Sequence, residues 1–281
     1  MSYIDAHVHV WTTDYAHYPL AKGYQKENIE PRSFTPKELF QHAKKVGVER
    51  VNLIQMSFYG FDNRYMLDMI ALYPKNFVGT AVIDVHAPRP DRLMTELARK
   101  KVRAFRIHPR LSKLPPERWL EPTGYKKMFA AGARNNQAMS CLIDPDGLPE
   151  VERMCRKFPE TPVVIDHLCR IGADGTIRDR DVDRLCALAK YPRVMVKVGA
   201  FYALGKKRPP YTDLAPLIKK VIAAFSVKRC MWESDSPFQV IRGHTYQASI
   251  DLVRKHLDFL SDEDREWLLR KTAEEFFFKN A

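Results

Sequence analysis

The sequence contains no long apolar run, no CxxC pair and no recognisable leader segment. A transmembrane helix needs roughly 18 consecutive apolar residues, and no stretch approaches that length, so we expect no membrane partner. Residues 1–11 lack the basic and apolar regions of a secretory signal peptide. The 5 cysteines are odd in number and irregularly spaced, which indicates reduced thiols rather than a disulfide framework. These absences predict a cytoplasmic protein.

Glycine is scarce as well, at 12 of 281 residues, and we find no internal repeat, linker or low-complexity segment. Such a composition excludes collagen, coiled coils and intrinsic disorder. A chain of this length buries roughly three quarters of its unfolded surface, so it needs no disulfide or metal in order to fold. We predict a single domain over residues 1–281.

Acidic residues are outnumbered by basic ones, 34 against 46, which gives a net charge of +12. A positive charge of this size favours anionic partners: nucleic acid, acidic lipid or an anionic metabolite. The densest basic stretches, residues 99–106 and 206–208, are short and far apart, which is typical of a solvated surface. Because no nucleic-acid-binding motif is recognisable, we expect no nucleic-acid partner and keep this function as a minor alternative.

Short segments rich in Val, Ile and Phe alternate with segments of helical spacing. The short segments mostly lack period-two alternation, as strands buried on both faces do. The predicted strands are residues 3–10, 51–56, 78–84, 102–108, 139–144, 163–166, 194–198 and 230–232. The predicted helices are residues 36–45, 63–72, 91–99, 123–135, 148–158, 181–189, 213–224, 245–257, 262–270 and 272–278. Strands that alternate with helices indicate βαβ units and a parallel sheet.

Eight such units in 281 residues predict the α/β class and a (β/α)8 TIM barrel. The main competitor, a doubly wound open sheet, is disfavoured because no GxGxxG motif follows any predicted strand. The longest gap follows the first predicted strand and is rich in aromatic residues between Trp11 and Tyr24. We expect it to form an aromatic loop over one end of the barrel.

Chemistry in such a barrel lies at the carboxyl ends of the strands. Four of the 9 histidines stand at or just after predicted strand ends. The polar residues at these ends are His7, His9, Gln55, Asp84, His108, Asp144, His167, Lys197 and Asp235. Ordinary loop polarity accounts for Gln55 and Asp84, but it explains the histidines less well.

The first predicted strand contains Asp5-Ala6-His7-Val8-His9. Residues two apart in a strand point to the same side, so Asp5 and both imidazoles are expected to share a face. Buried histidines need ligands or hydrogen-bond partners, and neutral imidazole is the commonest protein ligand for metals. His7 and His9 are therefore candidate metal ligands.

Two further candidates end the sixth and eighth predicted strands. His167 is either a site residue or a side chain that caps its strand by bonding to backbone. Asp235 is a candidate metal ligand, water-orienting group or general base. The stretch around Asp235, Ser-Asp-Ser-Pro, is also ordinary turn chemistry. The joint pattern on three strands favours an active site.

The stretches IDAHVHVW, VRAFRIHPRL, VVIDHLCRIG, VMVKVGAFY and MWESDSPF are spread in this order over most of the chain. Together they resemble the amidohydrolase superfamily, in the branch of lactonases and metal-dependent decarboxylases. Within that branch the chain is similar to 2-pyrone-dicarboxylate and sugar lactonases. The resemblance implies an active site of His7, His9, His167 and Asp235. Asp5 before the first-strand histidines is more similar to the lactonases.

The resemblance also bears on metal content. No lysine or glutamate stands at the fourth predicted strand end to bridge two ions, and Arg106 and His108 occupy that end instead. The fifth predicted strand lacks the histidine that the decarboxylases place there. We predict one divalent ion, zinc, on His7, His9 and Asp235, with an open position for water. The alternative is a metal-independent site, as in some lactonases of this branch.

Basic residues near the strand ends indicate the charge of the substrate. Arg106, Arg110, Arg170 and Lys197 are expected at one mouth, where guanidinium groups grip carboxylates. His108 and Tyr202 are expected to contact the substrate as well. The predicted partner is a small anionic molecule. Whether the chain forms a homo-oligomer stays open.

We therefore predict an enzyme, a hydrolase that opens a lactone or similar cyclic ester. Asp235 takes a proton from water, and His167 polarises the carbonyl or shuttles the proton. The oxyanion is stabilised by a metal on His7 and His9 or by the protonated histidines. Two alternatives stay open: decarboxylation of an aromatic or enoic acid, and an inactive barrel that binds nucleic acid.

Overall fold

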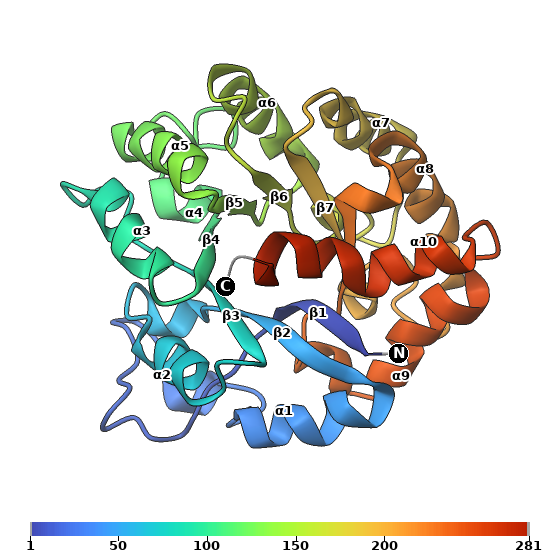
Figure 1. The fold of residues 1–281 in the computed structure, drawn as a ribbon, viewed down its shortest axis with the longest axis horizontal. Helices are drawn as coiled ribbons and strands as arrows, with labels where there is room; N and C mark the ends of the chain where they lie inside the picture. The colour runs from blue at the N-terminus through green and yellow to red at the C-terminus, as the bar shows by residue number, and fades with distance from the viewer. Residues whose placement is uncertain (1, 280–281) are drawn as a thin grey trace.

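Eight parallel strands form the centre of the molecule, and helices surround them (Figure 1). The computed structural model describes residues 2–279. Each strand pairs with the next along the chain, from β1 to β8. The strands are β1 (Tyr3–Val8), β2 (Val48–Ile54), β3 (Phe77–Ala81), β4 (Val102–Ile107), β5 (Ala138–Cys141), β6 (Val163–Ile165), β7 (Val194–Gly199) and β8 (Cys230–Glu233). Every predicted strand is present, most of them ending one to three residues earlier than predicted.

The helices follow the predicted segments closely. They are α1 (Pro36–Ala43), α2 (Arg64–Leu72), α3 (Pro90–Ala98), α4 (Pro109–Ser112), α5 (Thr123–Asn135), α6 (Leu148–Lys157), α7 (Asp179–Ala187), α8 (Ala215–Phe225), α9 (Tyr246–Asp251) and α10 (Asp262–Glu266). Thr35 caps α1 in a capping box with Glu38. The ends of the last two helices differ from the prediction: α9 and α10 continue as wider π-helical turns over Leu252–His256, Trp267–Lys271 and Glu274–Phe278.

The barrel closes between the ends of β1 and β8. Val8 pairs in parallel with Ser236. The amide of His9 donates to the Ser236 carbonyl at 2.8 Å, and the amide of Asp235 donates to the His7 carbonyl at 3.0 Å. This closure confirms the predicted TIM barrel over the open sheet. It also brings the first-strand histidines beside Asp235.

The C-terminal segment seals the opposite end of the barrel. Figure 1 shows this segment crossing the barrel, with the strands behind it. Ala273 and Phe277 pack against inward-facing, fully buried residues of six strands: Ile4, Ala6, Val78, Ala104, Ala138, Val164 and Met231. The C-terminal segment thus covers the end of the barrel opposite the carboxyl ends of the strands.

A bulge in β1 changes which side chains point inward. Asp5 pairs with Val51 and Val8 with Leu53, so three steps along β1 match two along β2. As a result, Asp5 does not share a face with the histidines, contrary to the expectation from strict alternation. Its carboxylate accepts a hydrogen bond from Tyr246 of α9 at 2.6 Å, on the outer side of the strand.

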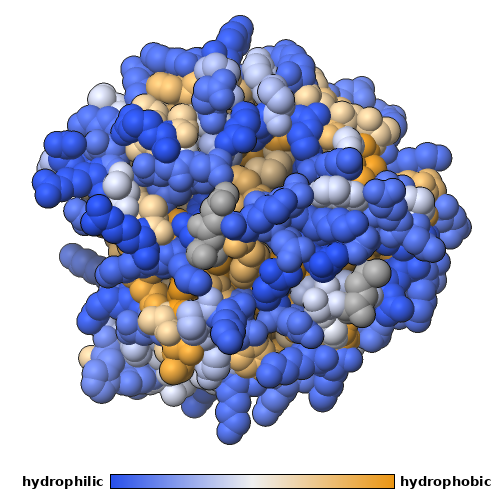
Figure 2. All heavy atoms as spheres, in the orientation of Figure 1, coloured by the Kyte–Doolittle hydropathy of each residue, from blue (hydrophilic) through white to orange (hydrophobic). Residues whose placement is uncertain are grey.

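Hydrophilic residues dominate the face that carries the C-terminal segment, and hydrophobic residues appear there in separate patches (Figure 2). This matches the expectation that most basic residues lie on a solvated surface. Within residues 2–279, every helix falls short of the length and apolar character that a bilayer crossing requires.

Candidate active site

A cavity of about 1060 Å3 opens at the carboxyl ends of the strands. Its wall includes His9, Arg106, His167, Tyr202 and Asp235. Each of these stands at or just after the end of a different strand. Barrel enzymes carry out their chemistry at this end of the fold, which makes the cavity the candidate active site.

The aromatic segment after β1 contributes less to the cavity than its composition suggested. Tyr24 reaches the cavity wall. Trp11 is buried and packs its ring against Phe34 and Phe58, with centroid distances of 6.3 and 5.5 Å. The first aromatic residue of the segment is therefore part of the hydrophobic core, and Tyr24 lies at the mouth.

His7 and His9 both face Asp235, as the sequence predicted. The Nε2 atoms of His9 and His7 lie 3.1 and 3.6 Å from Asp235 Oδ1. All three side chains are buried, and their potential ligand atoms lie within 4.8 Å of one another. The three residues from opposite ends of the chain thus form one cluster.

The Asp235 carboxylate is surrounded by hydrogen-bond donors and positive charge. The Tyr202 hydroxyl donates to Oδ2 at 2.6 Å, while His9 contacts Oδ1. Burial raises the pKa of Asp235, but the positive charge of His167 and the hydrogen bond from His9 outweigh burial and hold this pKa well below its usual range. The group is therefore ionised at neutral pH. Its φ of 62° is rare for a non-glycine residue.

His167 opens a left-handed turn directly after β6. The φ angles across His167–Arg170 lie between 51° and 57°, a conformation that costs ~1–2 kcal/mol per residue. The Nδ1 atom of His167 lies 2.7 Å from Glu233 Oε1. Burial lowers the pKa of His167, but the carboxylates of Glu233 and Asp235 outweigh burial and raise it overall. His167 is thus a cation beside the cavity, with a proton to give.

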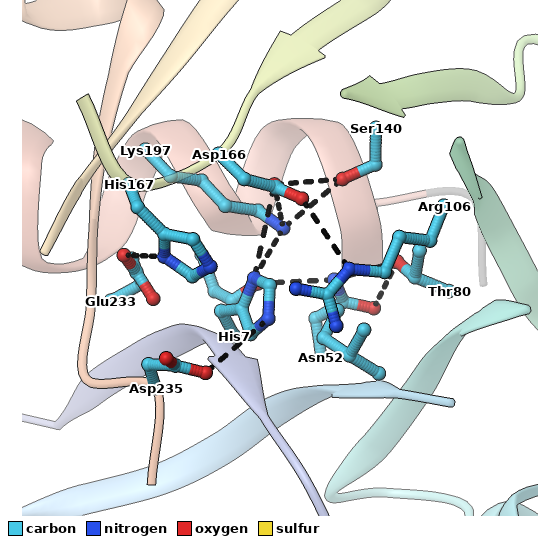
Figure 3. Close-up of polar contacts among 12 residues, drawn as sticks. His7, Asn52, Thr80, Arg106, Ser140, Asp166, His167, Lys197, Glu233 and Asp235 are labelled. Atoms are coloured by element: carbon cyan, nitrogen blue, oxygen red, sulfur yellow. Dashed lines mark hydrogen bonds and ion pairs between the residues drawn. The ribbon is translucent and has the colours of Figure 1, made fainter. Parts of the chain in front are cut away.

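A buried network lies on the other side of His7 (Figure 3). Lys197 Nζ lies 2.9 Å from Asp166 Oδ1 and 3.1 Å from His7 Nδ1. The Ser140 hydroxyl donates to the same Asp166 oxygen at 2.8 Å. Lys197 is fully buried and is not among the residues that line the cavity. The structure therefore places it behind His7 and not among the substrate contacts.

Arg106 lies on β4, and Figure 3 shows its guanidinium directed toward Asp166. Its side chain is 12% exposed, and its Nε lies 4.0 Å from Asp166 Oδ2. It also lines the cavity. This places a largely buried positive charge beside the space between the histidines and the open mouth.

Three more predicted substrate contacts, His108, Arg110 and Arg170, line the cavity together with Lys207. Burial, followed by the charges of Arg106 and Arg110, lowers the pKa of His108 to about 4. Arg170 pairs with Asp144 at 3.2 Å. The mouth therefore carries a positive field that is only partly balanced by carboxylates.

Sequence reasoning missed three buried residues of the site: Ser140, Asp166 and Glu233. Asp166 and Glu233 are fully buried, and each ends an apolar strand segment, VVID and CMWE. An acidic residue that directly follows such a run is costly to bury without a partner. That signal could have identified both carboxylates before the structure was known.

The candidate metal ligands agree with a divalent ion in position but not in protonation. His9 Nδ1 donates to the Ile54 carbonyl at 2.9 Å, and its Nε2, which lies 3.1 Å from Asp235 Oδ1, has to be unprotonated in order to bind an ion. His7 Nδ1 faces the Lys197 ammonium, which accepts no hydrogen bond. A second possible group, His7 with His167 and Glu233, shares the same histidine. Candidate metal sites therefore exist, but the donor set does not fit while Lys197 faces His7.

The amidohydrolase family matches the chain over residues 4–279. The chain is 26% identical over 247 residues to L-fucono-1,5-lactonase of Burkholderia ambifaria, which covers 86% of this chain and 82% of the relative. It is 23% identical over 238 residues to 4-sulfomuconolactone hydrolase of Rhizobium radiobacter, which covers 83% of this chain and 75% of the relative.

Solved structures share the barrel. A probable 2-pyrone-4,6-dicarboxylic acid hydrolase from Acinetobacter baumannii, with citric acid bound, has a TM-score of 0.82 at 22% identity over 99% of each chain. An amidohydrolase from Burkholderia multivorans with bound zinc has a TM-score of 0.80 at 20% identity over 99% of each chain. A 5-carboxyvanillate decarboxylase from Sphingomonas paucimobilis has a TM-score of 0.71 at 12% identity over 98% of each chain. At these identities the likeness shows the fold.

The family match extends over almost every described residue and includes all the strand-end residues of the site. It confirms the resemblance inferred from the five sequence stretches. The chain therefore belongs to the amidohydrolase family, and it is a hydrolase built on a (β/α)8 barrel.

Proposed function

We propose that this enzyme opens a lactone of a small, anionic metabolite by adding water to the ring carbonyl. The observation that carries the proposal is the ionised Asp235 carboxylate at the wall of a cavity that also contains three arginines, Arg106, Arg110 and Arg170. The two relatives support it, since both are named as enzymes that hydrolyse lactones.

The first step is attack by water. A water molecule in the cavity donates a hydrogen bond to Asp235, and its oxygen adds to the carbonyl carbon as the proton passes to the carboxylate. The Tyr202 hydroxyl and His9 hold the Asp235 carboxylate in place. The low pKa keeps Asp235 ready to accept this hydrogen bond at any pH near neutrality.

The second step breaks the ring bond. The tetrahedral oxyanion lies among positive groups, with Arg106 and His167 beside the cavity, and such preorganised charge lowers the barrier to acyl transfer. When the carbonyl re-forms, the ring oxygen leaves and takes a proton from His167. The product is an open-chain hydroxy acid. The proton that Asp235 received returns His167 to its charged form.

The sequence left open whether a divalent ion assists this reaction. The donor set of His7, His9 and Asp235 does not fit zinc while Lys197 faces His7. The two steps above use only groups of the chain, and they do not depend on such an ion.

The arginines indicate the substrate class. Guanidinium groups bind carboxylates and related anions through paired hydrogen bonds. Arg106, Arg110 and Arg170 all line the same cavity of about 1060 Å3. This arrangement favours a small molecule with an acidic group over nucleic acid.

A substrate panel tests the proposal. We would assay sugar 1,5-lactones, carboxylated lactones and aromatic acids, recording acid release and carbon dioxide separately. We expect hydrolysis of lactones, with higher kcat/KM for the carboxylated members. Arg110→Met should raise KM for these about tenfold or more, and the control Arg180→Met, on the exposed side of α7, should not. Carbon dioxide release from aromatic acids without lactone hydrolysis would overturn the proposal in favour of decarboxylation.

A further inference from the structure

Lys197 makes a complete set of contacts in the buried network behind His7. A lysine ammonium has three N–H donors and no acceptor. Its Nζ lies 2.9 Å from Asp166 Oδ1, 3.1 Å from His7 Nδ1 and 3.4 Å from Ser140 Oγ. Lys197 and Asp166 are both fully buried. The three donors therefore have three neighbours, and each neighbour has to accept.

The Ser140 hydroxyl fits this requirement. It donates its own hydrogen to Asp166 Oδ1 at 2.8 Å, which leaves its oxygen free to accept from Lys197. Asp166 is an acceptor as a carboxylate, and the charge of Lys197 helps to overcome burial and to hold the pKa of Asp166 well below its usual range. The remaining neighbour is His7 Nδ1. A proton on Nδ1 would point at an ammonium group.

His7 consequently carries its hydrogen on the other ring nitrogen. In neutral imidazole one nitrogen donates and the other accepts, and the partner of one decides the state of the other. Since Nδ1 accepts from Lys197, the ring holds a single hydrogen and is neutral. The Nε2 atom of His7 is buried, makes no hydrogen bond among residues 2–279, and lies 3.6 Å from Asp235 Oδ1.

We infer that Lys197 is a positioning residue that fixes His7 in the tautomer protonated on Nε2, so that His7 donates a hydrogen bond at the reacting centre and does not ligate a metal. The lactone carbonyl oxygen as acceptor of this hydrogen bond rests on the proposed function. The tautomer of His7 is independent of that function.

His9 provides an internal comparison. Its Nδ1 donates to the Ile54 carbonyl at 2.9 Å, and its Nε2 lies 3.1 Å from Asp235 Oδ1. Nδ1 thus donates in His9, whereas it accepts in His7. His9 and Asp235 still offer two ligand atoms, whereas a catalytic zinc site normally has three protein ligands. Because Lys197 faces Nδ1 of His7, the Nε2 atom of His7 is protonated and does not serve as the third ligand.

The direct test is the 15N NMR spectrum of the wild-type protein labelled at histidine, without substrate. His7 is assigned from the signals lost in His7→Asn. We expect a protonated Nε2 and an unprotonated Nδ1 for His7, and a protonated Nδ1 for His9. A protonated Nδ1 on His7 would overturn the inference. Because no turnover is measured, this result is independent of the lactone assay.

A second test measures zinc binding by titration calorimetry. In Lys197→Met the ammonium is gone, His7 can move its hydrogen to Nδ1, and Nε2 becomes a ligand. Outer-shell partners of metal-bound histidines change affinity ~10–100-fold, so we expect zinc to bind about that much more tightly than in the wild type. Lys100→Met, on the exposed surface, is the matched control. Equal zinc affinity in folded Lys197→Met and wild type would contradict the inference. If Lys197→Met does not fold, the NMR measurement on the wild type decides.

Discussion

At the scale of single residues, the partner of Nδ1 distinguishes the three histidines of the site. His7 faces an ammonium, His9 a backbone carbonyl and His167 a carboxylate. The same side chain therefore accepts at Nδ1 in His7 and donates at Nδ1 in His9 and His167. Sequence shows which strand end carries a histidine, but not which group stands behind it.

Asp235→Asn should lower kcat on the true substrate by ~10²–10⁴-fold, the usual contribution of general-base catalysis. The amide is nearly isosteric, but it accepts no proton from water, so the melting temperature and much of the substrate affinity should be retained. The measurement is steady-state kinetics with a melting curve on each variant. Asp174→Asn, at an exposed ion pair with Arg178, is the control. A folded Asp235→Asn enzyme within tenfold of wild-type kcat would remove Asp235 from its role as base.

His108 predicts a pH dependence of stability. Its pKa falls from 6.5 to about 4 in the folded protein, because of burial and then the charges of Arg106 and Arg110. Between these values the unfolded chain binds a proton that the native chain does not, so the free energy of unfolding rises with pH across this window. The shift corresponds to at most about 3 kcal/mol.

His108→Gln should flatten that part of the profile. Urea unfolding of wild type and variant across this pH range gives the difference directly. Other buried histidines affect both proteins alike, so only the difference is informative. Profiles with the same slope in both proteins would show that His108 is not held neutral.

At the scale of elements, the C-terminal segment after α10 is part of the barrel core and not an appendage. Phe277 is fully buried against the inner residues of the strands, at the end opposite the cavity. Removing a buried phenylalanine side chain typically costs ~3–5 kcal/mol. Phe277→Ala should lose about this much unfolding free energy in urea, and folded protein should keep its wild-type kcat. The partly buried Phe276 is the control, since Phe276→Ala should cost less. A loss below about 1 kcal/mol for Phe277→Ala would show that this end is not closed by Phe277.

Most of the barrel could be predicted from the sequence because each strand is a short segment rich in apolar residues between helical ones. The bulge in β1 could not be predicted, because no residue type in this segment indicates a bulge. The bulge places Asp5 on the outer side of the strand. The ends of α9 and α10 were missed in a similar way, because apolar spacing does not separate α-helical from π-helical turns.

The candidate site, too, could be predicted only in part. His7, His9, His167 and Asp235 were predicted because histidine and aspartate at strand ends are conspicuous. Lys197 was expected to point into the mouth, and its direction depends on Asp166, a contact between neighbouring strands that sequence spacing does not show. The buried carboxylates were overlooked because acidic residues near loops are common.

At the scale of the whole molecule, the chain is predicted to unfold as one domain. The strands pair from β1 to β8, the barrel closes through His7, His9, Asp235 and Ser236, and the last helical turns contact strands from both halves. Far-ultraviolet circular dichroism and tryptophan fluorescence should therefore report coincident urea transitions. Two separable transitions, or a proteolytic fragment that stays folded alone, would contradict the single-domain prediction.

The central claim is that water attacks a lactone carbonyl at Asp235, and isotope transfer tests it most directly. The enzyme is incubated with a hydrolysed lactone of the panel in H2(18)O, and the product is analysed by mass spectrometry at early times. The account predicts one 18O atom in the new carboxylate, no carbon dioxide, and no labelled product from Asp235→Asn beyond the uncatalysed level. Label in the hydroxyl instead of the carboxylate, or release of carbon dioxide in place of labelled acid, would contradict it.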